Sequence, residues 1–138
     1  MNWRLLAFVV SFVACKEKTP QTTTRMRDSI DVAKQYIRKI PGVDEQFDRA
    51  EVERGKVLIA YSDCYMCHTE KNRAKGPAFE DIAKRYPANN GYVELLARKI
   101  IIGGSGAWGY PVMSPHPEIQ IEDAKLMVKY ILSLESKK

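Results

Sequence analysis

The chain has 138 residues, which is enough for one domain with additional length at its ends. Its net charge is +5, but residues 16–42 hold seven Lys/Arg against three Asp/Glu, whereas residues 43–138 hold fourteen of each sign. This neutral C-terminal part contains no nucleic-acid-binding motif, so composition and charge give no support to a role in DNA or RNA binding.

The first fourteen residues are typical of an export signal. Met1 to Arg4 form a short basic segment, and Leu5 to Ala14 are apolar except for Ser11. Ten residues of helix span about 15 Å, half of the hydrocarbon core of a bilayer, so residues 1–14 are predicted to be a signal peptide and not a membrane span.

The segment Phe12-Val13-Ala14-Cys15 resembles a bacterial lipobox, in which the cysteine is lipidated and becomes the mature N-terminus. Phe12 departs from the aliphatic residue usual at its position. Cys15 is therefore predicted to carry a lipid anchor, and ordinary cleavage that leaves a free thiol is the alternative.

The residues after Cys15 have the composition of a linker. Lys16 to Arg27 are polar and Thr-rich, and the apolar residues of Ser29 to Ile40 have the spacing of a short amphipathic helix that Pro41-Gly42 would end. We assign residues 15–42 to a lipid-anchored linker and 43–138 to the folded domain. The excess of positive charge in the linker suits contact with anionic lipid headgroups, and the alternative is that these basic residues are simply solvated.

A helix is predicted to begin at Asp48. Asp48 and Glu51 have the spacing of a capping box, and Phe47 and Val52 have that of a hydrophobic staple. The helix is expected to run to about Ser62, just before the most informative motif in the chain.

That motif is Cys64-Tyr65-Met66-Cys67-His68, the C-x-x-C-H signature of covalent haem attachment. Two thiols three positions apart can reach the two vinyl groups of one porphyrin, and His68 then lies next to the iron. A thioredoxin-like dithiol or half of a zinc site is the alternative. A zinc site needs two further ligands, and the only other Cys or His residues are Cys15 and His116.

Three further helices are predicted beyond the motif. One covers Phe79 to Tyr86, one runs from an Asn90 cap to Gly103-Gly104, and the last covers Ile121 to Leu134. No segment is predicted to be a strand. The fold class is therefore all-α, and haem would complete the core of this small domain.

The candidates for a second iron ligand are Met66, Met113, Met127 and His116. Met66 lies inside the attachment motif and cannot reach the opposite face of the ring, and Met127 lies on the apolar stripe of the last helix. Met113 lies in a Gly/Pro-rich loop that can wrap the ring edge, so it is preferred, with His116 next.

From about Asp48 to Leu134 the chain resembles the small bacterial class I cytochromes c. The shared features are a helix before the haem motif, Gly76-Pro77, a Trp-Gly loop leading to Met113, and an aromatic residue, Tyr130, in the closing helix. The resemblance implies a cytochrome c fold of four to five short helices around one covalent haem c.

The resemblance also implies roles for single residues. The Pro77 carbonyl would accept the Nδ1 proton of His68, Trp108 would donate to a haem propionate, and Gly55 and Tyr130 would mark the crossing of the first and last helices. The chain departs from the family pattern where proline usually flanks the ligand methionine, and where Asn often stands three residues later. Here those residues are Val112, Ser114 and His116.

With His68 and Met113 as ligands, the chain is predicted to be a single-electron carrier and not an enzyme. It would act on the periplasmic side of a bacterial membrane, between a quinol-oxidising complex or dehydrogenase and a terminal oxidase or reductase. The alternatives are a haem enzyme or sensor with an open axial site, and a protein without haem. The basic residues Lys71, Arg73 and Lys75 are candidates for docking an acidic partner, or are a solvated loop.

Overall fold

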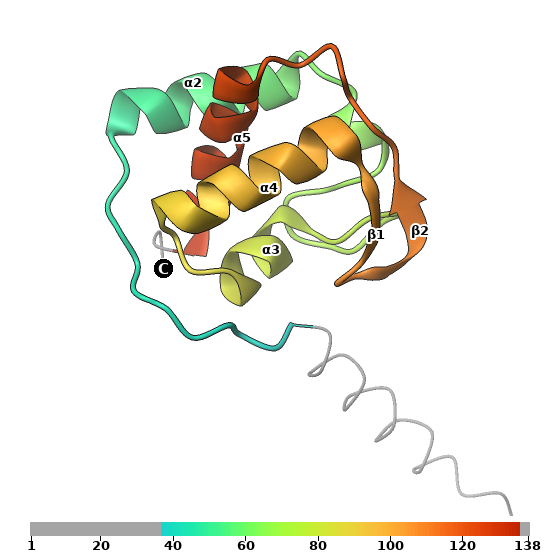
Figure 1. Ribbon diagram of the computed structural model, residues 1–138, viewed down its shortest axis with the longest axis horizontal. Helices are drawn as coiled ribbons and strands as arrows, with labels where there is room; N and C mark the ends of the chain where they lie inside the picture. Colours follow the sequence, from blue (N-terminus) through green and yellow to red (C-terminus); the bar gives the residue numbers. More distant parts are fainter. Residues whose placement is uncertain (1–36, 136–138) are drawn as a thin grey trace, which may run out of the picture.

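The computed structural model describes residues 37–135, so the predicted signal peptide, Cys15 and most of the linker lie outside the described residues. Figure 1 shows four α-helices and a two-stranded hairpin packed together. In chain order these are α2 (Arg49–Ala60), the short 3₁₀ turn η1 (Cys64–Met66), α3 (Phe79–Arg85), α4 (Asn90–Ile102), β1 (Gly104–Gly106), β2 (Gly109–Met113) and α5 (Ile121–Ser133).

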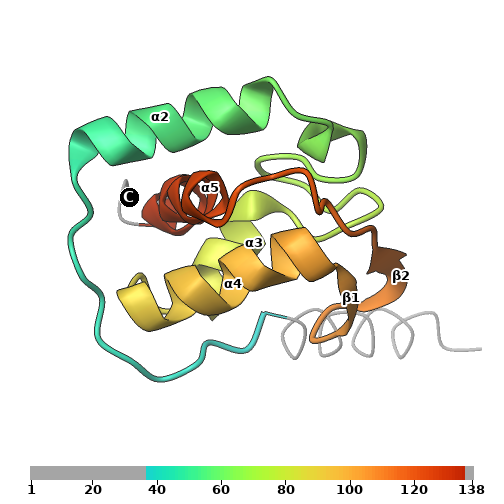
Figure 2. The ribbon, with the colours of Figure 1, turned by 45° about the horizontal axis from the view of Figure 1, so that its top comes forward.

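Helices α2 and α5 cross in close contact, with α2 along one edge of the molecule and α5 beneath it (Figure 2). Gly55 of α2 makes the approach possible, because a Cβ atom at this position would lie 2.0 Å from the carbonyl oxygen of Leu126 in α5. Tyr130, one turn further along α5, is buried. The crossing that the family resemblance implied at Gly55 and Tyr130 therefore lies where it was expected.

The start of α2 confirms the predicted cap. The Asp48 carboxylate accepts hydrogen bonds from the backbone N–H groups of Ala50 (2.9 Å) and Glu51 (3.2 Å). The Glu51 carboxylate does not complete a capping box. It accepts a 2.6 Å hydrogen bond from Lys129 in α5 instead. The residue thus joins the two terminal helices.

The start of α4 differs from the prediction by one residue. Asn89, not Asn90, is the cap, because its backbone is extended and its side-chain oxygen accepts from Tyr92 N at 3.1 Å. Asn90 is the first helical residue, and its side chain donates to Glu45 at 2.8 Å. The helix ends where expected, at Gly103, whose φ of +70° suits glycine.

The prediction that no segment forms a strand is wrong for residues 104–113. Strands β1 and β2 form a short antiparallel pair in which Gly104 lies opposite Met113 and Gly106 opposite Gly109. All of the hairpin residues except Met113 and Trp108 are exposed, so the sequence has no alternation of apolar and polar residues to indicate a sheet.

The folded part of the chain extends a few residues before Val43. The N–H of Ile40 donates to Arg85 O at 2.8 Å, and Glu45 N donates to Ala88 O at 2.6 Å. Gly42 packs so closely on Pro87 that a Cβ atom would lie 2.5 Å from the proline ring. Residues 40–45 therefore form a strap across the turn between α3 and α4. Residues 37–40 are not helical, and the rest of the helix expected over Ser29 to Ile40 lies outside the described residues.

The hydrophobic core lies between the four helices. Ile59, Val128 and Leu132 are each 1% exposed, and Met127 is buried among them, as its place on the apolar stripe predicted. Between residues 37 and 135, no helix is long and apolar enough to cross a membrane.

Candidate functional site

The two thiols of the C-x-x-C-H motif lie in a tight turn directly after α2. The N–H groups of Cys67 and His68 both donate to Cys64 O, at 3.2 and 2.9 Å. Neither thiol forms a disulfide; Cys64 is half-buried and Cys67 is exposed. Burial raises the pKa of the Cys64 thiol, and the Ser62 hydroxyl, 3.0 Å from its sulfur, acts in the opposite direction. Both thiols are therefore held on one turn and available for covalent attachment.

The imidazole of His68 is fixed by three neighbours. Its Nδ1 lies 2.7 Å from Pro77 O, and its ring stacks on Phe79 with centroids 5.3 Å apart and planes 16° apart. Gly76 packs against the ring edge, since a Cβ atom there would lie 2.6 Å from His68 Cε1. Because a carbonyl oxygen only accepts, Nδ1 carries the proton and Nε2 keeps its lone pair for a metal ion.

The loop that holds Gly76 and Pro77 in place is itself tied down by backbone hydrogen bonds. Gly76 N donates to Cys67 O at 2.7 Å, and the N–H groups of Phe79 and Glu80 donate to Thr69 and Glu70 at 2.9 Å each. The start of α3 is thus hydrogen-bonded to the residues that follow His68. This pairing fixes the Pro77 carbonyl relative to the imidazole.

Met113 is the last residue of β2 and the only one in that strand that is not exposed. It packs against the edge of the hydrophobic core, whereas Met66 is 72% exposed. The β1–β2 hairpin and the loop after the thiol turn lie at the same end of the molecule in both views (Figures 1 and 2). The structure therefore brings Met113 to the end of the domain where the attachment motif lies.

Trp108 lies at the tip of the same hairpin, half-buried against α3. Its ring centroid is 6.2 Å from that of Tyr86, and the Arg85 guanidinium lies 4.9 Å from it. Its carbonyl oxygen accepts from Arg73 at 3.4 Å, and Arg73 also donates to Tyr110 O at 3.4 Å. Trp108 therefore joins the hairpin both to α3 and to the loop after His68.

His116, the alternative ligand, has partners at both ring nitrogens. Nδ1 lies 3.3 Å from Ile100 O, and Nε2 lies 3.2 Å from the Asp63 carboxylate. Both partners are oxygen acceptors, so whichever ring nitrogen bound iron would first have to leave its acceptor. This arrangement favours Met113 over His116.

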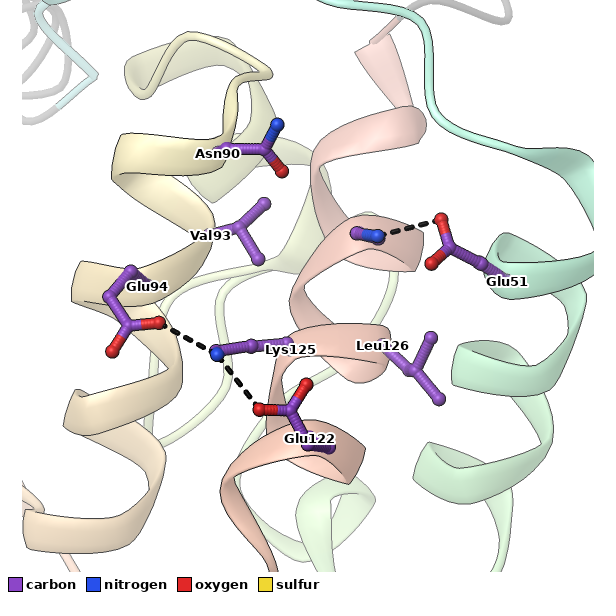
Figure 3. A pocket seen from close by; sticks show the side chains of 8 residues that line it. Glu51, Asn90, Val93, Glu94, Glu122, Lys125 and Leu126 are labelled. Atoms are coloured by element: carbon purple, nitrogen blue, oxygen red, sulfur yellow. Dashed lines mark hydrogen bonds and ion pairs between the residues drawn. The ribbon is translucent and has the colours of Figure 1, made fainter.

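Figure 3 shows a separate pocket of about 270 Å³ on the surface formed by α2, α4 and α5. Its charged groups pair with one another: Lys125 contacts Glu94 and Glu122 at 3.0 and 2.9 Å, and Lys129 contacts Glu51. None of the predicted site residues lines it. We interpret it as a surface ion-pair network between helices.

Several contacts of the site were not predicted from the sequence. Nothing in the local pattern indicates that Phe79 stacks on His68, or that Asp63 binds His116, since each depends on how distant segments fold back. For Gly76 the local signal is the glycine itself, because a residue without a Cβ atom allows another group to approach its backbone closely.

Comparison with known proteins is consistent with this geometry. The family model described as Cytochrome c matches residues 52–135. Cytochrome c-551 of Azotobacter vinelandii is 35% identical over 81 residues, covering 59% of this chain and 98% of the relative. Cytochrome c-552 of Hydrogenobacter thermophilus is 40% identical over 78 residues, covering 56% of this chain and 79% of the relative. The crystal structure of wild-type Nitrosomonas europaea cytochrome c552 superposes with a TM-score of 0.54 at 35% identity, over 57% of this chain and 98% of that one.

The chain belongs to the cytochrome c family, in which a covalently bound c-type haem transfers electrons. Within the family it is a small bacterial cytochrome of class I with a single haem. This excludes the dithiol and zinc interpretations of the motif. Within the described residues, no group of three or more His, Cys, Asp or Glu side chains converges as a metal site would require.

Proposed function

We propose that Cys64 and Cys67 bind the haem through thioether bonds, and that His68 and Met113 are its two axial ligands. The observation that carries this assignment is the hydrogen bond from His68 Nδ1 to Pro77 O, because it directs the Nε2 lone pair away from the protein backbone. Gly76 provides the space that the imidazole occupies. The two free thiols and the prepared imidazole are the donor set that a c-type haem requires.

The haem iron supplies a one-electron couple between Fe(III) and Fe(II). The residues around it set the conditions for that couple. Pro77 keeps the proton on Nδ1, which makes His68 a stronger donor, and the soft thioether of Met113 favours the reduced state. We propose that Trp108, whose ring packs on Tyr86 and Arg85, donates its indole N–H to a propionate.

With both axial positions filled by side chains of the chain itself, no substrate can reach the iron. We therefore propose that this cytochrome is an electron carrier and not an enzyme. A haem enzyme or gas sensor would need an open position opposite His68. The partial burial of Met113, in a strand whose other residues are exposed, supports the carrier.

Replacing Met113 tests the carrier assignment. In holoprotein matured with haem, Met113→Ala is expected to remove the weak sulfur-to-iron absorption of the oxidised state and to lower the reduction potential. Met66→Ala is the matched control, because Met66 is 72% exposed and lies in the attachment turn; it should leave both properties unchanged. Wild-type absorption and potential in Met113→Ala would show that another residue is the ligand.

The covalent attachment has its own test. The mass of the exported protein should exceed that of the polypeptide by one haem, and denaturation should not remove it. Cys64→Ala with Cys67→Ala should abolish the addition. A polypeptide mass without haem, or with bound zinc, would contradict the assignment.

We further propose that the chain is exported and held at the periplasmic face of a membrane by a lipid on Cys15. The lipobox-like residues before Cys15 and the basic linker after it support this location. Cys15→Ala should move the protein from the membrane fraction to the soluble periplasmic fraction without changing its spectrum. A wild-type protein that is already soluble after export would contradict the anchor.

The partners of the carrier are other redox proteins. We propose a quinol-oxidising complex or dehydrogenase as donor and a terminal oxidase or reductase as acceptor. Lys71 and Lys75 are exposed in the loop after His68, where they suit an acidic docking face. Lys71→Glu with Lys75→Glu should slow electron transfer to such a partner at low salt and leave the reduction potential nearly unchanged.

A further inference from the structure

His116 lies where three segments of the site meet. Its N–H is shared between the carbonyl oxygens of Ile100 (3.2 Å) and Ile101 (3.1 Å) in the last turn of α4. Its ring bridges Ile100 O at 3.3 Å and the Asp63 carboxylate at 3.2 Å. Its side chain is only 15% exposed, whereas that of Asp63 is 63% exposed, so the imidazole is shielded from water and the carboxylate faces it.

The partners of His116 lie next to the attachment motif and just before the β1–β2 hairpin. Asp63 immediately precedes Cys64, the first thiol of the attachment motif, and Ile100 lies just before the β1–β2 hairpin. His116 itself follows the hairpin, three residues after Met113. One side chain thus connects the thiol turn to both ends of the segment that carries Met113.

We propose that His116 is a positioning residue, which holds the Met113 hairpin against the attachment turn through its contact with Asp63. This inference rests on the proposed role of Met113 as a ligand. Movement of the hairpin away from the thiol turn would favour release of the thioether from iron. The bridge opposes this movement, because it ties His116, three residues after Met113, to Asp63 at the thiol turn.

The Arg73 contacts alone are a weaker restraint. Arg73 reaches the hairpin from an exposed position over two 3.4 Å distances to carbonyl oxygens. The contact of His116 with Asp63 pairs a carboxylate with a ring N–H, and hydrogen bonds of this kind to a charged partner are among the stronger ones.

Binding of exogenous imidazole to the oxidised holoprotein measures how readily Met113 leaves the iron. Four proteins form a double-mutant cycle: wild type, His116→Gln, Asp63→Ala and the double variant. Each single substitution is expected to raise the imidazole affinity about tenfold, the size of one charge-assisted hydrogen bond. The double variant should gain no more than either single one, since both remove the same contact.

Glu118→Ala is the control for loss of a carboxylate. Glu118 is exposed on the same loop, two residues beyond His116, and its removal should leave the imidazole affinity unchanged. Asp63→Ala alters an exposed turn and does not depend on tolerance of a new side chain at residue 116. It therefore keeps the test decisive even if His116→Gln fails to fold.

Equal imidazole affinities in all variants, or effects of His116→Gln and Asp63→Ala that add, would overturn the positioning role. The sulfur-to-iron absorption of the wild type separates this result from failure of the proposed function. If that absorption is present and the cycle shows no coupling, only the role of His116 is wrong. If it is absent from the wild type, the assignment of Met113 fails, and the positioning role fails with it.

Discussion

At the scale of single residues, three neighbours hold the imidazole of His68, the proposed iron ligand, in a defined position. The Pro77 carbonyl fixes the tautomer of the ring, and stacking on Phe79 fixes its tilt. The missing side chain of Gly76 lets the ring lie close to the backbone. The absence of a side chain at Gly76 is as important as the presence of the other two. A methyl group there would occupy the space of the imidazole.

Gly76→Ala is therefore expected to displace His68 and to weaken its bond to iron. The new Cβ would lie 2.6 Å from His68 Cε1, closer than atoms of this kind approach each other in proteins. The holoprotein should show a lower melting temperature and partial high-spin character in its absorption spectrum. Gly91→Ala is the matched control, since its Cβ meets only Asn89 at 3.4 Å. Equal spectra for the two variants would contradict the role of Gly76.

Tyr130 gives a prediction for pH. Burial raises its pKa from 10 to about 12, and the negative charge of Glu70 and the neighbouring Tyr65 act in the same direction. Between pH 10 and 12 the unfolded chain loses this phenolic proton first, so the free energy of unfolding falls as the pH rises. Below pH 10 the Tyr130 hydroxyl is protonated in both the folded and the unfolded state, so it does not make the free energy of unfolding depend on pH.

The measurement is the melting temperature of wild type and Tyr130→Phe from pH 9 to 12. The difference in melting temperature between the two proteins should be constant below pH 10. Above pH 10 the melting temperature of the wild type should fall relative to that of Tyr130→Phe. Parallel curves over the whole range would show that the Tyr130 hydroxyl does not titrate differently on folding.

At the scale of secondary structure, the ends of helices were predictable where a side chain makes the cap locally. The start of α2 followed from Asp48, and the end of α4 from Gly103. The start of α4 was misplaced because Asn89 and Asn90 are both good caps, and the choice depends on Glu45 of the strap, which binds Asn90 from a distant position.

Asn89→Ala and Asn90→Ala test this distinction. Asn89→Ala removes the cap of α4 and the hydrogen bond to Val43 O, so it should lower the free energy of unfolding by about 1–2 kcal/mol. Asn90→Ala removes only an exposed contact with Glu45 and should cost less, about 0.5 kcal/mol. Chemical denaturation of both variants is the measurement, and equal losses would contradict the assignment of Asn89 as the cap.

The β1–β2 hairpin could not be predicted from its sequence in the same way. Its residues bury little apolar surface, and Arg73 contacts it from a distant loop, through Trp108 O and Tyr110 O. The sequence did indicate that Met113 lies in an irregular, Gly-rich segment and not in a helix. The location of the candidate ligand was thus predictable, and the form of the backbone that carries it was not.

At the scale of the whole molecule, the all-α architecture and the order of the helices followed from apolar spacing and caps, and the crossing of α2 and α5 from the family resemblance. What the sequence could not give is how closely those two helices approach. That distance depends on the backbone of Leu126, which lies 2.0 Å from where a Cβ at Gly55 would be.

Gly55→Ala is expected to separate α2 from α5 and to lower the free energy of unfolding by about 3 kcal/mol, the upper end of the usual cost of overpacking. Thermal unfolding of the holoprotein is the measurement, again with Gly91→Ala as control. A loss in the free energy of unfolding of less than about 1 kcal/mol would contradict this, because it would show that the two helices can move apart with little loss of stability.

The crossing of α2 and α5 also affects when the domain can close during synthesis. A chain that emerges from its N-terminus first presents α2 long before α5, and α2 alone has no partner for its apolar face. Cys64 and Cys67 lie directly behind α2, so they remain in an open chain until residues 121–133 have arrived. The position of the last helix at the end of the domain therefore sets when α2, and the thiol turn directly behind it, acquire their final surroundings.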